Sequence, residues 1–228
     1  MTGEAGTRIE ARRRRSSAGD EARDRLLDTA EQLFADYGLD GASMRQIRLA
    51  TGNANNSFVQ YHFGDKAGLI REIINRRNER MEPHRRRLLD EAEAQGRLGD
   101  IRTLLEIIYL PLASATDAEG HHVFARFLMQ FLTNLQYRDG MPVPGLPEQS
   151  ANTRAARLLK ALLPDLALDL FSARVLRVGH MFMIALVDRD NARAQGRQLG
   201  DDQAFFDDVF AMMAAAIAAA PPTGRRSG

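Results

Sequence analysis

The chain has 228 residues, 44% of them hydrophobic, which suffices for the core of one large domain or two modest ones. Its 31 basic and 30 acidic side chains give a formal net charge of +1, so any affinity for a polyanion must come from local charge distribution. The absence of cysteine excludes disulfides and thiolate chemistry. The sequence has neither a long uncharged apolar run nor an apolar signal segment, so we expect a cytoplasmic protein without a membrane partner.

The two ends of the chain have the composition of irregular structure. Residues 1–19 are rich in Gly, Ser, Thr and Arg and include the consecutive arginines Arg12–Arg15, which predicts a disordered basic arm. Such an arm could follow a nucleic-acid backbone or enter a minor groove, or it could be only a solvated tail. Residues 221–228 predict a second disordered tail.

An amphipathic helix is predicted from about residue 20 to Gly38. Its apolar residues recur at spacings of three and four, as on one face of an α-helix, and a glycine suits the left-handed position that ends a helix. These apolar residues are Leu26, Leu27, Ala30, Leu33, Phe34 and Tyr37.

The segment between Asp40 and Asp65 holds 24 residues without an acidic side chain, although acids and bases balance in the chain as a whole. Duplex DNA carries about one negative charge per 1.7 Å of its axis, so a surface that lies against it disfavours carboxylates. The amides, hydroxyls and arginines of the segment suit phosphates and base edges. The composition therefore predicts a DNA-binding surface.

The same segment predicts two short helices around a tight turn. Ser43 is a suitable N-cap for the first helix, and Gly52 can end it. Asn55 or Asn56 can cap the second helix, which runs to about Tyr61. Two helices joined by a turn with glycine form a helix-turn-helix.

The motifs of residues 20–70 resemble those of the TetR family of bacterial transcriptional regulators. The strongest is Tyr61-His62-Phe63 followed by Lys66 and Leu69, and weaker ones are Leu-Phe before Tyr-Gly in the first helix and Ile-x-x-Ala-x-Gly in the second. The chain departs from the family at Arg48, where an alanine is usual, and in a turn that is one residue longer.

The resemblance implies an all-α protein with two functional parts. A three-helix, helix-turn-helix DNA-binding domain would occupy residues 20–66, and a larger helical effector-binding and dimerisation domain would occupy residues 67–220. We expect the second helix of the motif to face the major groove and the nearby bases to position the DNA backbone. The predicted DNA-binding residues are Arg45, Arg48, Asn55, Asn56, Ser57, Gln60, Tyr61, His62 and Lys66.

Beyond residue 66 the apolar patterns are helical, and no strand pattern or internal repeat is present. Asp100 is a suitable N-cap for a helix that is apolar on nearly all sides, which predicts a central buried position. Three prolines exclude a helix from the loop at 139–148. The predicted helices span about residues 66–93, with a bend or boundary at Pro83, and 100–112, 119–138, 149–163, 167–190 and 201–219.

The last two predicted helices are apolar over broad faces that include many alanines. These faces could be covered within one subunit, or they could pack against a second copy as a four-helix bundle. A homodimer suits a helix-turn-helix, because duplex DNA then meets two recognition helices.

The resemblance also implies a small-molecule pocket in the helical domain. The aromatic and methionine side chains there suit a largely apolar effector, and a polar stripe on the predicted helix 119–138 could fix a ligand or face solvent. The candidate ligand-binding residues are Tyr109, Phe124, Phe127, Gln130, Phe131, Asn134 and Met181. No cofactor or metal is expected, because the adjacent His121 and His122 diverge by about 100° on a helix.

These patterns predict a ligand-responsive transcriptional regulator. It would bind a pseudo-palindromic operator as a dimer, act as a repressor and leave the operator when a small-molecule effector binds. One alternative is a DNA-binding protein without an effector; another is a helical enzyme or binding module with a chance helix-turn-helix match. The sequence has no Gly-rich phosphate loop, nucleophile elbow or His-Glu-x-x-His motif, so we do not expect an enzyme.

Overall fold

The computed structural model describes residues 3–51, 56–134 and 147–221, and the side chains of residues 19–51, 60–134 and 147–221. Within these residues the chain is all-helical, as predicted. The helices are α1 (Gly3–Gly41), α2 (Met44–Ala50), α3 (Asn56–Phe63), α4 (Lys66–Ala94), α5 (Ile101–Ala113), α6 (Val123–Thr133), α8 (Ala151–Ala161), α9 (Leu168–Ala194) and α10 (Asp202–Ala218).

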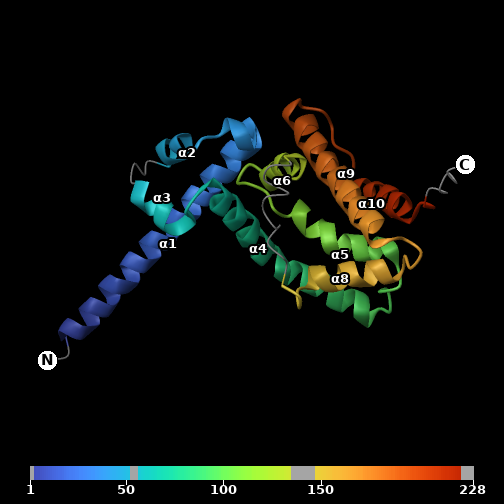
Figure 1. The fold of residues 1–228 in the computed structure, drawn as a ribbon, viewed down its shortest axis with the longest axis horizontal. Coiled ribbons are helices and arrows are strands. Elements are labelled where there is room, and N and C mark those ends of the chain that lie inside the picture. Colours follow the sequence, from blue (N-terminus) through green and yellow to red (C-terminus); the bar gives the residue numbers. More distant parts are fainter. Residues whose placement is uncertain (1–2, 52–55, 135–146, 222–228) are drawn as a thin grey trace, which may run out of the picture.

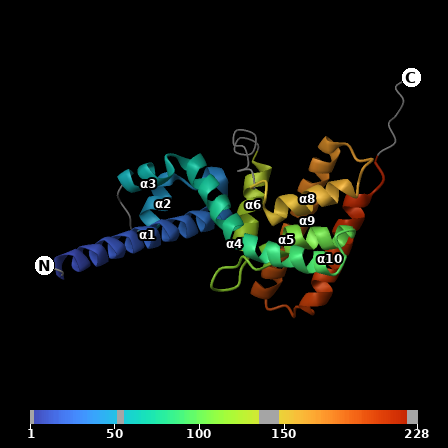
Figure 2. The same ribbon diagram turned by 90° about the horizontal axis from the view of Figure 1, so that it is seen from below.

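The helices form two groups that α4 connects. Helices α1 to α3 lie at one end of the molecule, and α5, α6, α8, α9 and α10 form a bundle at the other (Figures 1 and 2). Helix α5 contacts α4, α8, α9 and α10, which confirms its predicted central position. Asp100 caps α5 as predicted, since its side chain accepts the backbone N–H groups of Arg102 and Thr103.

The core of the first group is the predicted apolar face of α1. Leu26, Leu27 and Phe34 are fully buried, as are Leu69 and Ile70 of α4, which contacts α1. Each such side chain contributes about 1.5–3 kcal/mol on burial. Tyr37, also expected on this face, is instead 65% exposed. The helix is interrupted directly after it, at Gly38, whose φ of 74° favours glycine.

Residues 3–19 differ from the predicted disordered arm, because α1 continues back to Gly3 and projects away from the other helices (Figure 1). The physical reason is that extending an existing helix costs far less than nucleating one, and Ala, Arg and Glu are good helix formers.

The predicted bounds of two further helices need correction. Helix α6 begins at Val123, not near residue 119, because Asp117 organises a turn by accepting the backbone N–H groups of Glu119 and His121. Gly120 completes this turn with a φ of 85°. Pro83 marks no boundary, since it lies inside the continuous helix α4.

Candidate nucleic-acid interface

A capping box fixes the start of α2. The backbone N–H of Ser43 donates to Gln46 Oε1 at 2.8 Å, and the backbone N–H of Gln46 donates to Ser43 Oγ at 3.2 Å. Ile47 is fully buried beneath this short helix, while Arg45 and Leu49 are exposed. Helix α2 therefore has one anchored face and one face open to a partner.

The junction between α3 and α4 fixes the direction of α3. Phe63 is buried at the end of α3, where the Arg23 guanidinium lies 5.8 Å from its ring centroid. Asp65 caps α4 by accepting the backbone N–H of Gly68 at 2.7 Å. A Cβ atom at Gly68 would lie 1.9 Å from the carbonyl oxygen of Phe63, so only glycine allows this close approach.

The outward face of α3 carries the predicted base-reading residues. Gln60, Tyr61 and His62 are exposed, and Tyr61 is 85% exposed. The rings of Tyr61 and His62 meet edge to face with centroids 5.1 Å apart. A large aromatic ring held so far into solvent is available for a partner.

Some predicted positions lie outside the described residues. These are Gly52 and Asn55 in the turn, together with the side chains of Asn56 and Ser57. Helix α3 itself begins at Asn56, where the sequence predicts an N-cap at Asn55 or Asn56.

Lys66 lies closer to the protein core than the sequence predicts. Its Nζ atom is 5.6 Å from the centroid of the buried Phe34 ring, which is a cation–π distance. Burial lowers the pKa of Lys66, and Asp40 partly opposes that change. Through this contact Lys66 links the α3–α4 junction to α1, in addition to any contact that it makes with DNA.

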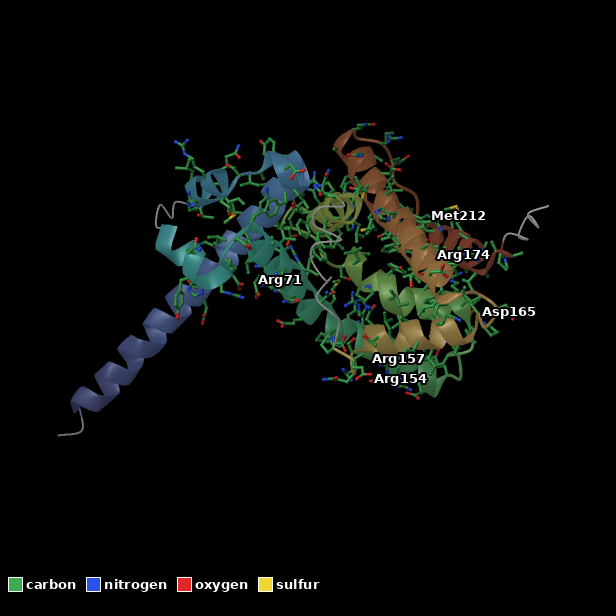
Figure 3. The ribbon with its side chains drawn as sticks, viewed as in Figure 1. Arg71, Arg154, Arg157, Asp165, Arg174 and Met212 are labelled. Atoms are coloured by element: carbon green, nitrogen blue, oxygen red, sulfur yellow. The ribbon has the colours of Figure 1, made fainter. Side chains whose placement is uncertain are left out.

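The helix-turn-helix and the start of α4 carry exposed basic side chains. Arg45 on α2 and Arg71 on α4 are exposed and form no ion pair among the described residues (Figure 3). Arg76 and Arg77, farther along α4, instead pair with acids of α1. Arg71 is not among the DNA-binding residues predicted from the sequence; its place five residues after Lys66 on the same helix was the available signal.

The predicted ligand-binding residues fall into two groups, one around Tyr109 on α5 and one on α6. Tyr109 donates to the carbonyl oxygen of Val175 at 2.8 Å, and burial raises its pKa. Met181 of α9 is partly buried against the core. Phe124, Phe127 and Phe131 are buried in α6, and the ring centroids of Phe127 and Phe34 lie 6.1 Å apart.

The polar stripe of α6, which includes the predicted ligand-binding residues Gln130 and Asn134, meets α1. Asn134 Nδ2 donates to Asp40 Oδ2 at 3.0 Å, and Arg126 lies 3.5 Å from Asp36. Gln130 Oε1 is 3.4 Å from where a Cβ of Gly38 would lie. Because α6 packs across the end of α1, these polar groups join the two parts of the molecule.

The described residues hold no cluster of three or more potential metal ligands. His122 is the N-cap residue of α6, and its ring and backbone N–H both contact Asp190.

The helices that carry these residues are similar to part of known proteins. Residues 26–73 match the family described as bacterial regulatory proteins, tetR family. Over 57 residues the chain is 37% identical to the HTH-type transcriptional repressor AcnR of Corynebacterium glutamicum, a match that spans 24% of this chain and 30% of that relative.

A crystal structure of a TetR-family transcriptional regulator from Pectobacterium atrosepticum matches 88% of this chain and 92% of that one, with 18% identity and a TM-score of 0.42. The match of residues 26–73 covers α2, α3 and the packed parts of α1 and α4. Residues 26–73 therefore form an N-terminal domain that matches the TetR family of bacterial regulatory proteins.

Proposed function

We propose that the chain is a transcriptional repressor that binds a pseudo-palindromic DNA operator as a homodimer and leaves it when a small-molecule effector binds. The observation that carries DNA binding is the exposed, acid-free surface of α2 and α3, between Asp40 and Asp65. Exposed Arg45 supplies positive charge there, and Gln60 and Tyr61 supply polar and aromatic groups. The similarity to a relative described as a repressor supports repression as the form of regulation.

The outer surface of α9 supports the homodimer. An 18-residue window of α9 has a mean hydropathy of 1.6, apolar enough to cross a membrane by length and composition, yet only 33% of it is buried. Ile184 is 50% exposed, and Met212 of α10 is 47% exposed (Figure 3). Uncovered apolar surface of this kind favours burial against a second copy.

Charges along α9 suggest how two copies meet. Arg177, Met181, Ile184 and Asp188 lie within about 60° of one another around the helix at 3.6 residues per turn. Arg177 and Asp188 are exposed, and neither forms an ion pair among the described residues. If two copies pair antiparallel about an axis between Met181 and Ile184, Arg177 faces Asp188 of the partner subunit. The symmetry of a two-fold interface produces this contact twice.

The test is selection of bound duplexes from fragmented genomic DNA by the full-length protein, followed by binding measurements on the enriched sequence. We expect a pseudo-palindromic site, bound more weakly by Tyr61→Ala and Arg45→Ala variants. Arg87→Ala, an exposed arginine in the distal half of α4, is the control that should bind as the wild type does. Enrichment of no sequence, or equal binding by all variants, would refute the proposal.

A further inference from the structure

Arg85 is a buried cation without a carboxylate partner. It lies on α4 and is 5% exposed, yet it forms no ion pair with a described residue. Its guanidinium reaches Asn78 Oδ1 at 3.3 Å and Met81 Sδ at 3.8 Å, and its Nε has no partner. Most of its five N–H donors therefore lack an acceptor.

The nearest acid does not neutralise Arg85. Glu82 Oε1 instead accepts from Arg86 at 2.9 Å and from the backbone N–H of Ala151 at 2.8 Å. An uncompensated charge in the interior is costly, and proteins normally pair it. Burial lowers the pKa of Arg85 to about 10, and the charge of Glu82 opposes this only in part.

A second unsatisfied group lies on α8, a helix that contacts α4. The hydrogen bond from Ala151 to Glu82 holds the first turn of α8 against the turn of α4 that precedes Arg85. The next residue of α8, Asn152, has a buried Oδ1 without a hydrogen-bond partner. Helices α4 and α8 therefore each carry a buried polar atom that no described residue satisfies.

A cavity of about 190 Å³ lies on the other side of Met81. Arg77, Arg80 and His84 line it together with apolar and hydroxyl groups, and no acidic side chain lines it. Met81 both lines this cavity and contacts Arg85. Met81, whose flexible side chain adapts readily, is therefore the residue shared by the cavity and the surroundings of Arg85.

We propose that Arg85 is the anchor for a compact organic carboxylate, bound with its anionic group on the guanidinium and its apolar part in the adjacent cavity. The planar guanidinium suits a carboxylate, because two parallel N–H groups meet two oxygens. This inference deepens the proposed effector response and rests on it. The effector is then apolar with one acidic group, and its carboxylate supplies the ion-pair partner that the described residues do not give Arg85.

The experiment measures thermal unfolding and calorimetric binding of the full-length protein with sodium hexanoate, at ionic strength held constant with sodium chloride. Hexanamide has the same shape without the charge, and sodium phosphate tests a tetrahedral anion. The variants are Arg85→Met and Arg85→Lys, with Arg87→Met as the matched control on the exposed side of α4.

We expect hexanoate, but not hexanamide, to raise the melting temperature of the wild type and of Arg87→Met. Arg85→Met should keep or exceed the ligand-free melting temperature, because it removes an unpaired charge, and should bind hexanoate about tenfold or more weakly. Arg85→Lys should bind at intermediate strength.

The proposal is overturned if hexanoate has no effect, if hexanamide acts equally, or if Arg85→Met still responds. A marked loss of ligand-free stability in Arg85→Met would show that Arg85 is purely structural, and a response to phosphate alone would overturn the carboxylate class. None of these measurements uses DNA, so their failure is distinguishable from failure of the proposed DNA binding.

Discussion

His122 Nδ1 lies 2.8 Å from Asp190 Oδ1, and the backbone N–H of His122 donates to the other carboxylate oxygen at 2.6 Å. Both residues are buried. The pair joins the N-cap of α6 to α9. His122 Nε2 also contacts the carbonyl oxygen of Ala113 at the end of α5. The buried His122–Asp190 pair thus links three helices of the bundle.

Asp190→Ala should therefore destabilise the protein by about 1–3 kcal/mol, because it leaves the buried N–H groups of His122 without their acceptor. Urea denaturation measures this loss. Asp165→Ala, an exposed position in the turn before α9 (Figure 3), should change stability by no more than about 0.5 kcal/mol. Equal effects of the two substitutions would contradict the assigned role of the pair.

The proposed contact between two copies of α9 predicts a charge-swap result. Arg177→Asp and Asp188→Arg should each weaken dimerisation, because each places like charges opposite one another in the antiparallel pairing. The double variant should restore the dimer, since both contacts are then reversed together. Sedimentation at micromolar protein concentration reports the result, and a double variant weaker than both single ones argues against this register.

Ile184→Glu tests the apolar centre of the same surface. A carboxylate buried there without a partner would be costly, so we expect a monomer that remains helical. Because a monomer presents only one recognition helix, its operator affinity should also fall. Unchanged sedimentation would place the interface elsewhere.

The contact between α6 and α1 predicts an effect on DNA binding without a large effect on stability. Arg126→Ala combined with Asn134→Ala removes the contacts with Asp36 and Asp40. These groups are partly exposed, so the loss of unfolding free energy should stay below about 1 kcal/mol. Operator affinity should fall, because the DNA-binding unit is held less firmly against the bundle. Thr133→Ala, whose hydroxyl bonds only within its own helix, is the control.

The features predicted correctly from the sequence are those that depend only on residues close together in the chain. The apolar spacing from Leu26 to Phe34 predicts the buried face of α1, and Ser43 and Asp100 start helices as their capping chemistry requires. Gly38 likewise ends the regular part of α1.

Contacts between distant segments could not be predicted in this way. Nothing in the sequence near Asn134 indicates that its amide meets Asp40, because the packing angle of α6 on α1 decides that contact. The same holds for Lys66 above Phe34 and for the unpaired Arg85, whose significance depends on what lies around it in space.

His84 predicts a specific dependence of stability on pH. Burial lowers its pKa, the charge of Arg87 lowers it further, and Glu91 opposes this. The unfolded state therefore binds a proton before the folded state does. The contribution of neutral His84 to the free energy of unfolding is fully present above the pKa of the unfolded state. It is lost as the pH falls through the pKa of the folded state.

His84→Gln should consequently lose less melting temperature than the wild type when the pH is lowered from about 7.5 to about 5, across the usual histidine pKa. The effect should be small, because the side chain is only partly buried. A larger loss in the variant would show that the sign of the shift is wrong.

On DNA, we predict that Lys66 contacts a phosphate and that Gln60 reads a base or the groove edge. A phosphate contact carries no sequence information, so Lys66→Met should weaken binding to operator and scrambled duplex alike and reduce the salt slope by about one unit. Since Lys66 also packs on Phe34, its unfolding free energy must be measured beside its affinity. Arg45→Ala, which removes an exposed side chain, is the control for the same electrostatic effect.

Gln60→Ala should behave differently, because its amide suits adenine and lies on the exposed face of α3. We expect a cost of about 1–3 kcal/mol on the operator, little change on scrambled duplex and relaxed preference at one base pair in each half-site. Tyr61 is the rival for this role, so Tyr61→Phe and Tyr61→Ala belong in the same series. Binding isotherms at several salt concentrations decide between the two. If Lys66→Met loses only operator affinity with an unchanged salt slope, or Gln60→Ala weakens both duplexes equally, the corresponding assignment is wrong.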